Sequence, residues 1–378
     1  MADEVLILGG GVGGTIVANL VAKHTSGKAH VTVVDTTGIH VYQPGFLYVA
    51  VGQEEPAGLQ RSEASLLRSD VTLVVERATR VDPVAQKVLL ESGRTLAYDQ
   101  LLLATGSRTL MEEVPGADEA HSFYTMDGAV RLFEALRGFE GGTIVIGVAG
   151  IPYKCPPAPV EFVFLLDDYL RARGIREDTQ VKLLSPLNRA FTIEATSKLV
   201  QPILAERDIE LIGFFNVESV NPLARTVTSL EGETISYDLL VLVPPHRGQR
   251  VIEDSSLGDE RGWVPVDKHT LKHTGFDHVW AIGDTTNLPI SKSGSVAHYE
   301  ATVVAAEITA EVKGEASPRR VYDGKVTCFL ETGQGRATTI SFDYVHPPIS
   351  PPPARRWHWA KALFNKTYWH TVPQGRLP

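Results

Sequence analysis

The stretch "VLILGGGVGGTIVANLVAKH", residues 5–24, decides the fold. Residues 5–8 form a short apolar run of the kind that becomes a buried strand. Glycines with the spacing G-x-G-x-x-G follow at Gly9, Gly11 and Gly14, and apolar residues then recur at helical spacing. This order predicts a strand, a glycine turn and a helix that together bind a dinucleotide.

Each glycine has a physical reason in such a turn. Gly9 permits the tight bend, Gly11 lets the backbone approach a pyrophosphate, and Gly14 lets helix and strand pack closely. The start of the helix presents free N–H groups to the phosphates. The next strand, "HVTVVD" (30–35), ends in Asp35, whose carboxylate suits ribose hydroxyls. A glycine turn with no ligand is the alternative, and the glycines alone do not separate NAD from FAD.

Length, charge and cysteine content narrow the class. A chain of 378 residues suggests two or three domains. A net charge of −9 argues against nucleic acid as a partner. Two cysteines cannot form a disulfide framework or a four-cysteine metal site, so we expect no metal and a reducing compartment. The opening "MADE" predicts no secretory leader, and no apolar run is long enough to span a membrane.

Two later segments resemble the flavoproteins that have two dinucleotide-binding domains. "YDQLLLATGSR" (98–108) is a strand followed by an Ala-Thr-Gly turn, and "HVWAIGDTTN" (278–287) is a strand followed by Gly-Asp, with a helix expected over about 296–312. The resemblance implies FAD, with further contacts from the loop "GIHVYQPGF" (38–46). The residues expected to hold FAD are Gly9, Gly11, Gly14, Asp35, Pro44, Thr105, Gly106, Gly283 and Asp284.

The resemblance implies an α/β fold with two Rossmann-like domains, the second inserted in the first. Residues 1–109 and 257–313 are expected to form the FAD domain. Residues 110–256 are expected to form the second domain. Residues 314–378 are expected to add a short C-terminal region with a second cysteine and an amphipathic helix.

The second domain is predicted to lack a nicotinamide cofactor. Its first strand, "GTIVIGVAG" (142–150), is followed by "IPYKCPP" (151–157) in place of a glycine fingerprint, and a helix is expected over 160–173. Prolines have no N–H groups with which to hold phosphates. The following strand ends at Ser185-Pro186, with no acid for a ribose.

Cys155 lies in that proline-rich loop, and three interpretations compete. It is a buried inert thiol, a redox thiol or a metal ligand. Local context favours the redox thiol, since the dipole of the following helix and the charge of Lys154 are expected to lower its pKa. Glu161, in the first turn of that helix, either shuttles protons or simply favours the helix dipole.

The segments "YKCPPAPVE" (153–161) and "GKVTCFLETG" (324–333) resemble the two cysteine segments of sulfide:quinone oxidoreductases. The resemblance implies that Cys155 and Cys328 flank the flavin and carry sulfur between them. Hydrosulfide attacks their bridge, leaves a persulfide and a thiolate, and two electrons then pass to FAD. Glu161 is the proton-handling residue that the resemblance transfers.

The sequence departs from many family members at two places. Tyr124 stands where many bacterial members have a third cysteine. Gly128 and "NRAFTIE" (188–194) stand where some members carry histidines near the sulfide channel.

The C-terminal segment is predicted to face the electron acceptor. "ARRWHWAKALFNKTYWH" (354–370) has the Trp and basic residues of an amphipathic helix that binds a membrane surface, although the same face suits packing on the protein body. The resemblance implies a quinone site at Phe329, Lys361 and Phe364. We expect weak peripheral attachment on the cytoplasmic side of the cell membrane, which a homo-oligomer would reinforce through avidity.

Three rival functions remain open from the sequence. One is the flavoprotein subunit of a flavocytochrome c sulfide dehydrogenase, and the loop at 38–46 lacks the cysteine that often holds FAD there. Another is a type II NADH dehydrogenase, against which the missing glycine fingerprint argues. The third is a sulfur-sensing flavoprotein without turnover.

Overall fold

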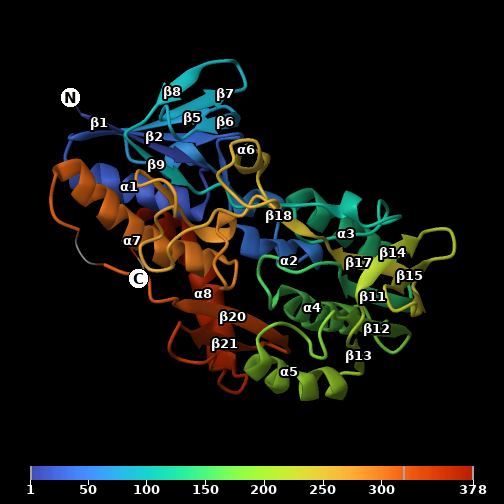
Figure 1. Ribbon diagram of the computed structural model, residues 1–378. Helices are drawn as coiled ribbons and strands as arrows, with labels where there is room; N and C mark the ends of the chain where they lie inside the picture. Colours follow the sequence, from blue (N-terminus) through green and yellow to red (C-terminus); the bar gives the residue numbers. More distant parts are fainter. Residues whose placement is uncertain (1, 318–319, 377–378) are drawn as a thin grey trace.

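Two parallel sheets lie side by side in the computed structural model, which describes residues 2–317 and 320–376 (Figure 1). The first sheet has the order β19-β9-β1-β2-β5, and all its neighbours run parallel. Its strands are β1 (Asp3–Leu8), β2 (Ala29–Asp35), β5 (Val71–Val75), β9 (Gln100–Leu103) and β19 (Val279–Ala281).

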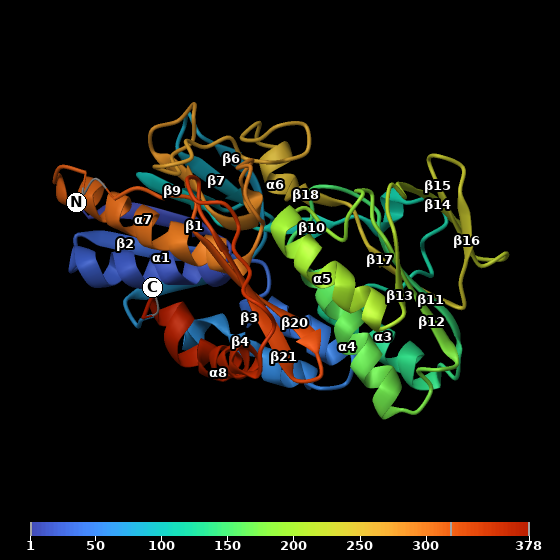
Figure 2. The ribbon, with the colours of Figure 1, turned by 90° about the horizontal axis from the view of Figure 1, so that it is seen from below.

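Helices α1 (Val12–Thr25) and α7 (Gly294–Lys313) pack against each other beside the first sheet (Figures 1 and 2). Residues 5–8 of β1 are all buried, as expected for a central strand of a parallel sheet covered on both faces. Gly14 permits the close approach of α1, because a Cβ there would lie 1.9 Å from the carbonyl oxygen of Gly9.

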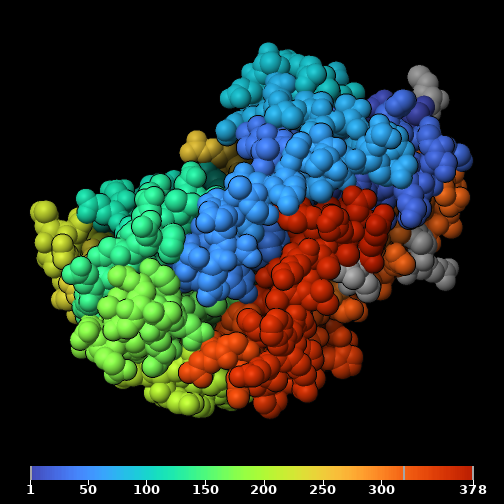
Figure 3. All heavy atoms as spheres, turned by 180° about the vertical axis from the view of Figure 1, so that it is seen from behind, coloured from blue at the N-terminus to red at the C-terminus, as the bar shows by residue number. Residues whose placement is uncertain are grey.

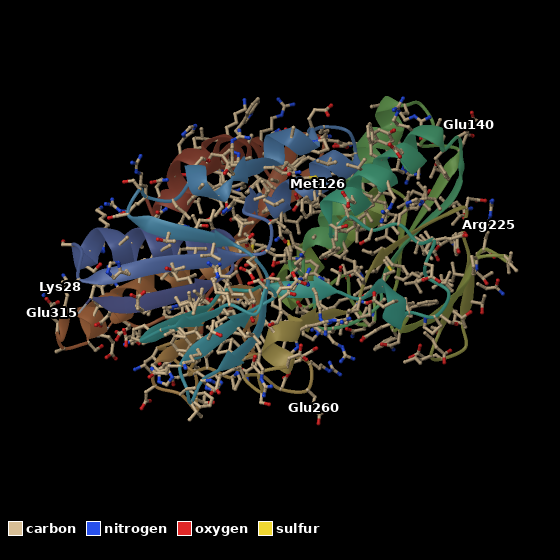
Figure 4. All side chains as sticks on the ribbon, turned by 90° about the horizontal axis from the view of Figure 1, so that it is seen from above. Lys28, Met126, Glu140, Arg225, Glu260 and Glu315 are labelled. Atoms are coloured by element: carbon tan, nitrogen blue, oxygen red, sulfur yellow. The ribbon has the colours of Figure 1, made fainter. Side chains whose placement is uncertain are left out.

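The second sheet has the order β13-β12-β11-β17 and is also parallel. Seen from above, Lys28 and Glu315 mark one end of the molecule, whereas Glu140 and Arg225 mark the other, beyond this sheet (Figure 4). The strands of the second sheet are β11 (Gly142–Val148), β12 (Thr179–Leu184), β13 (Ile209–Ile212) and β17 (Leu239–Val243). The helices of this part of the chain are α3 (Met126–Gly138), α4 (Ala158–Ala172) and α5 (Glu194–Glu206).

Shorter elements join and flank the two sheets. The antiparallel pair β10–β18 lies where the chain passes between them. The strands are β3 (Ile39–Val41), β4 (Gln60–Ser62), β6 (Ala78–Asp82), β7 (Lys87–Leu90), β8 (Thr95–Ala97), β10 (Ser107–Thr109), β14 (Val217–Asn221), β15 (Thr226–Ser229), β16 (Thr234–Ser236) and β18 (His246–Gly248). The short helices are η1 (Gln43–Gly45), α2 (Phe46–Ala50), η2 (Pro56–Leu59), η3 (Glu63–Ser65), η4 (Met111–Glu113), α6 (Arg250–Glu253), η5 (Gly283–Thr285) and η6 (Val372–Gln374).

The C-terminal region is a hairpin followed by a helix. Strands β20 (Val326–Gly333) and β21 (Arg336–Phe342) pair antiparallel, and α8 (Arg355–Thr371) follows. The hairpin passes between α8 and α4, and packs against both (Figure 2). The proline-rich stretch 347–354 returns along β21 and pairs with it at both ends.

The tip of this hairpin is fastened to the second sheet's helices. Gly333 lies against Arg207, and a Cβ at Gly333 would fall 2.2 Å from the guanidinium. Arg207 in turn contacts Asp167, a fully buried residue of α4, at 3.1 Å. The backbone N–H of Gln334 donates to Asp168 at 2.6 Å. The strand that carries Cys328 is therefore held at its end by charged groups of another element.

A buried polar chain connects the first glycine turn to α8. Thr15, in the first turn of α1, donates to Glu63 at 2.7 Å, and Glu63 pairs with His40 at 3.0 Å. The other ring nitrogen of His40 lies 2.8 Å from the hydroxyl of Tyr368. Viewed from behind, the C-terminal segment in red lies against the N-terminal third in blue (Figure 3).

The predicted α/β fold is confirmed, and the main elements lie where the sequence predicts them. Helix α4 begins at Ala158, two residues before the predicted start at 160. Pro157 and Pro159 fit there because the first turn of a helix needs no N–H donors. Helix α7 extends the predicted 296–312 slightly at both ends and stops at Gly314, whose φ of +65° is left-handed.

Candidate active site

Cys155 lies in the loop between β11 and α4, and its backbone conformation is left-handed, with a φ of +54°. Its N–H donates to the carbonyl of Lys292 at 2.6 Å, and its own carbonyl accepts from Ala158 at 2.9 Å. These bonds fix the cysteine loop between the start of α4 and the segment that precedes α7. Strained backbone of this kind is often found at functional sites.

Cys328 comes from β20, far along the chain, and meets the same segment. Its sulfur lies 3.9 Å from the hydroxyl of Ser295 and 4.0 Å from that of Ser293. Both cysteines are free thiols and half-buried. The segment 292–295 therefore contacts both cysteines of the chain, a contact that sequence reasoning did not identify.

The thiol groups are harder to ionise than the sequence suggested. Burial, the nearby Cys328 and the carboxylate of Glu161 raise the pKa of Cys155 well above its usual range. Burial also raises the pKa of Cys328, although Ser295 and Ser293 oppose this. The predicted lowering of the Cys155 pKa is wrong, since burial outweighs the favourable charges nearby, and the Lys154 amine donates to Gln43 at 2.8 Å. The Lys361 ammonium partly opposes this rise.

Glu161 and Lys361 form a buried ion pair between α4 and α8. Their side chains are only 3% and 8% exposed. Burial raises the pKa of Glu161, and the Lys361 ammonium only partly opposes this. Burial disfavours the charge on Lys361, but the Glu161 carboxylate outweighs it and raises the pKa of that ammonium well above its usual range. The pair lies close enough to influence the pKa of both cysteines.

Three more residues extend this pair, and sequence reasoning missed all of them. Tyr48 of α2 donates to Glu331 of β20 at 3.4 Å, and the Lys361 nitrogen lies 5.3 Å from the centre of the Tyr48 ring. Glu331 meets His358 of α8 at 3.0 and 3.1 Å. The sequence held one indication of His358. It lies three residues before Lys361, and residues three apart on a helix share a face.

Phe329 and Phe364, the predicted aromatic residues of a quinone site, lie near each other. Their ring centres are 6.4 Å apart, with 41° between the planes. Phe329 follows Cys328 in β20, and Phe364 is one turn of α8 from Lys361. The fold thus gathers the predicted cysteine, proton and quinone residues around one hairpin.

Tyr124 lies beside the same site. Burial, with smaller contributions from Tyr153 and Cys155, raises the pKa of the Tyr124 phenol well above its usual range. Its hydroxyl is buried and has no hydrogen-bond partner among the described residues. Its ring meets His246 edge-on, with ring centres 5.1 Å apart.

The glycine turn fits a dinucleotide. Gly11 and Gly106 have nothing within 4 Å of the position where a Cβ would lie, so a ligand can approach the backbone there. Helix α1 has no side-chain cap and no acid in its first turn, which leaves donors for phosphates. Asp35 accepts from Gly10 at 2.9 Å and from Gly38 at 2.8 Å, so its carboxylate orders the turn itself.

Most of the other predicted FAD residues follow the carboxyl ends of β9 and β19. Thr105 and Thr285 face each other, with 3.1 Å between their hydroxyls, and join the two later turns. Gly283 donates to Glu300 at 2.5 Å. Pro44 lies exposed in η1, next to the Gln43 that binds Lys154. This donor set and open backbone fit FAD.

Asp284 and Lys292 form a further polar group at the start of α7. Burial raises the pKa of Asp284, while Lys154 and Lys292 oppose the shift. Burial lowers the pKa of Lys292 to about 8. Lys292 donates to the backbone carbonyls of Asp284 and Thr286 at 2.9 and 2.6 Å, and lies 3.8 Å from the ring centre of Trp263.

The described residues also bear on metal binding and membrane crossing. In residues 2–317 and 320–376, His, Cys, Asp and Glu form no group of three or more arranged to hold a metal ion. Across the same residues, each helix is too short or too polar to cross a membrane.

Comparison with known proteins identifies the family. Residues 3–307 match the pyridine nucleotide-disulphide oxidoreductase family. The mitochondrial sulfide:quinone oxidoreductase of Mus musculus is 30% identical over 358 residues, covering 92% of this chain and 79% of that protein. The sulfide-quinone reductase of Aquifex aeolicus is 24% identical and covers 100% and 93%. The crystal structure of the sulfide:quinone oxidoreductase from Aquifex aeolicus superposes with a TM-score of 0.88 at 23% identity, again covering 100% of this chain and 93% of that one. The chain therefore belongs to the pyridine nucleotide-disulphide oxidoreductase family and, within it, to the sulfide:quinone oxidoreductases.

Proposed function

We propose that this enzyme oxidises sulfide through Cys155 and Cys328 and delivers the electrons, by way of FAD, to a quinone. The observation that carries the residue assignment is the meeting of the chain's two cysteines at one segment, residues 292–295, although they lie far apart in the sequence. An inert thiol has no need of this arrangement.

The sulfur chemistry follows thiol–disulfide exchange. In the oxidised enzyme a sulfur bridge joins the two cysteines. Hydrosulfide attacks one sulfur of the bridge, the new S–S bond forms as the old one breaks, and the other cysteine leaves as a thiolate. Bound FAD would supply the two-electron acceptor for this chemistry. The net reaction is H₂S plus quinone giving one sulfur atom plus quinol, so two electrons and two protons move.

Glu161 and Lys361 are proposed to handle these protons. Both cysteine thiols have raised pKa values because they are buried, so a thiolate formed at the site needs a nearby positive charge. Lys361 provides that charge, and Glu161, whose pKa burial raises, can hold a proton in the uncharged carboxyl. General acid–base work requires a group whose pKa lies near the working pH.

The quinone is proposed to lie between Phe329 and Phe364, with Lys361 beside it. A flat quinone ring gains from aromatic contacts on its faces. An ammonium can donate to a quinone carbonyl oxygen, where negative charge grows during reduction.

The second domain is proposed to bind no nicotinamide cofactor. The prolines at 157 and 159 remove donors from the start of α4, and the N–H groups of Ala158 and Glu161 bond to backbone carbonyls of the loop. The acid Glu161 also stands in the first turn, where a pyrophosphate would meet it. This supports sulfide over NADH as the electron source. We also propose domain boundaries of 1–109 with 257–313, 110–256 and 314–378.

Helix α8 is proposed to rest on the cytoplasmic surface of the cell membrane. Trp359 and Leu363 are 67% and 63% exposed, while Phe364 on the same helix packs toward the core. Exposed Arg355, Arg356 and Lys366 flank them, and none of the three forms an ion pair within the described residues. Apolar side chains with a basic border suit an anionic membrane surface. Such attachment is weak for a single helix, and a homo-oligomer would strengthen it.

Substituting serine for either cysteine tests the sulfur chemistry. We expect Cys155→Ser and Cys328→Ser to retain FAD, measured by the flavin spectrum, but to lose sulfide-dependent quinone reduction. Sulfide bleaching of the wild-type flavin in a stopped-flow experiment, with no bleaching by NADH, separates this function from an NADH dehydrogenase. Wild-type turnover by either serine variant would remove the cysteine mechanism.

A further inference from the structure

We propose that Glu331 and His358 form the outer half of a proton relay that supplies the quinone site from solvent. This deepens the proposed function and rests on it. His358 is the solvent end of the relay, Glu331 is the buried carrier, and the Glu161–Lys361 pair is the inner end.

The first support is the placement of the pair. His358 is the exposed partner, with 34% of its side chain accessible, whereas the side chain of Glu331 is 4% accessible. The ring nitrogen Nδ1 of His358 lies 3.0 and 3.1 Å from the two carboxylate oxygens of Glu331. The proton between them can therefore exchange with solvent on the His358 side and with the protein interior on the Glu331 side.

The second support is the connection inward. Tyr48 donates to Glu331 at 3.4 Å, and its ring lies 5.3 Å from the Lys361 nitrogen. Lys361 contacts Glu161. His358 and Lys361 also lie on one face of α8, three residues apart. The two acid–base pairs thus meet at one tyrosine.

The third support is the need for such a path. Quinone reduction takes up two protons for two electrons, and Lys361 and Glu161 are buried. An ammonium that gives its proton to a quinone oxygen must regain one before the next turnover. In the proposed step, Lys361 loses a proton to the quinone, Glu331 passes one inward by way of Tyr48, and His358 restores it from solvent. This cycle runs twice for each quinone, so both protons of the quinol come from solvent, while the two electrons come from reduced FAD.

An imidazole suits the outer position because one ring nitrogen can accept a proton while the other gives one up. The titratable groups that surround the pair are Tyr48 on α2, Glu161 on α4 and Lys361 on α8. The competing explanation is mechanical: the contact between Glu331 and His358 would merely hold α8 on β20.

The experiment isolates the quinone half of the reaction. The FAD-loaded enzyme is reduced with dithionite and mixed with decylubiquinone, and flavin reoxidation is followed by stopped flow at several pH values. His358→Gln keeps an N–H donor for Glu331 but does not titrate. We expect it to slow reoxidation about 100-fold, the lower end of the range for acid–base groups. Wild-type reoxidation should slow as pH rises, because quinone reduction takes up protons, and the variant should be slower than wild type across the pH series.

Two further variants separate proton transfer from mechanical support. In His358→Ala, added imidazole should restore part of the rate, because a free base replaces a proton carrier but does not hold a helix in place. His370→Gln, an exposed histidine on the same helix, should behave as wild type. The rate of flavin reduction by sulfide should not change in any of the three.

The outcomes are distinct. Wild-type reoxidation by His358→Gln at every pH overturns the relay, and so does a loss in His358→Ala that imidazole fails to restore. Failure of sulfide to reduce the wild-type flavin overturns the proposed function instead. The dithionite experiment still decides the relay in that case, since it does not depend on sulfide.

Discussion

Replacing Lys361 by methionine would leave the Glu161 carboxylate buried without its partner. Breaking a buried ion pair on one side costs about 3–5 kcal/mol if the remaining group stays charged. Alternatively, the Glu161 carboxylate takes up a proton and becomes neutral. Relative to the ordinary pKa of 4.5, this costs about 1.36 kcal/mol for each pH unit, or about 3.4 kcal/mol at pH 7. The loss in the free energy of unfolding at pH 7 should therefore not exceed about 3.4 kcal/mol.

The pH dependence gives this prediction its sign. Removing the ammonium raises the pKa of folded Glu161 further above its unfolded value. The folded state then binds more protons than the unfolded state, so stability falls as pH rises. Below about pH 4.5 both states hold the proton, and the extra destabilisation of Lys361→Met should disappear.

Denaturant unfolding of the FAD-loaded protein at several pH values provides the measurement. Adding Glu161→Gln to Lys361→Met should recover most of the loss at neutral pH, because no buried charge remains. Lys366→Met, at an exposed position of the same helix, should change stability by less than about 0.5 kcal/mol. A loss in Lys361→Met that is equal at pH 5 and pH 7, and that Glu161→Gln does not relieve, would refute the electrostatic account.

Three other changes test separate parts of the structure. Gly14→Ala forces a Cβ to 1.9 Å from a backbone carbonyl, and we expect loss of FAD from the purified protein, read from its absorbance spectrum. Gly333→Ala places a Cβ 2.2 Å from Arg207 at a φ of +75°, and should lower the free energy of unfolding by about 1–3 kcal/mol; an unchanged thermal midpoint would contradict this. Trp359→Ser with Leu363→Ser should weaken sedimentation with anionic vesicles while sulfide still bleaches the flavin, and undiminished binding would exclude α8 as the membrane contact.

The sequence predicted the first sheet well because local patterns determine it. Gly9, Gly11 and Gly14 follow an apolar strand, and the steric need for a glycine at each position can be inferred from the local sequence alone. The pairing of Cys155 with Cys328 was different, since nothing local joins two residues so far apart. It came from resemblance to a family, and the structure places both residues at the segment 292–295.

The electrostatics of the site was beyond sequence reasoning. Lys154 adjoins Cys155 in the chain, so a lowered thiol pKa seemed to follow. In the folded protein, Lys154 points to Gln43 instead, and burial dominates the thiol. Glu331 and His358 were missed for a related reason. Each is a residue type that is common on protein surfaces, and only the packing of α8 on the hairpin brings the two side chains into contact.

The buried chain from Thr15 through Glu63 and His40 to Tyr368 has a consequence for biosynthesis. A ribosome releases the first glycine turn early, but Tyr368, which completes its polar surroundings, is made about 350 residues later. Strand β19 imposes a similar delay, because it is an edge strand of the first sheet and is complete only when residue 281 has been made. The nucleotide-binding half should therefore mature only after α8 has left the ribosome, and a nascent chain arrested before α8 should hold FAD poorly.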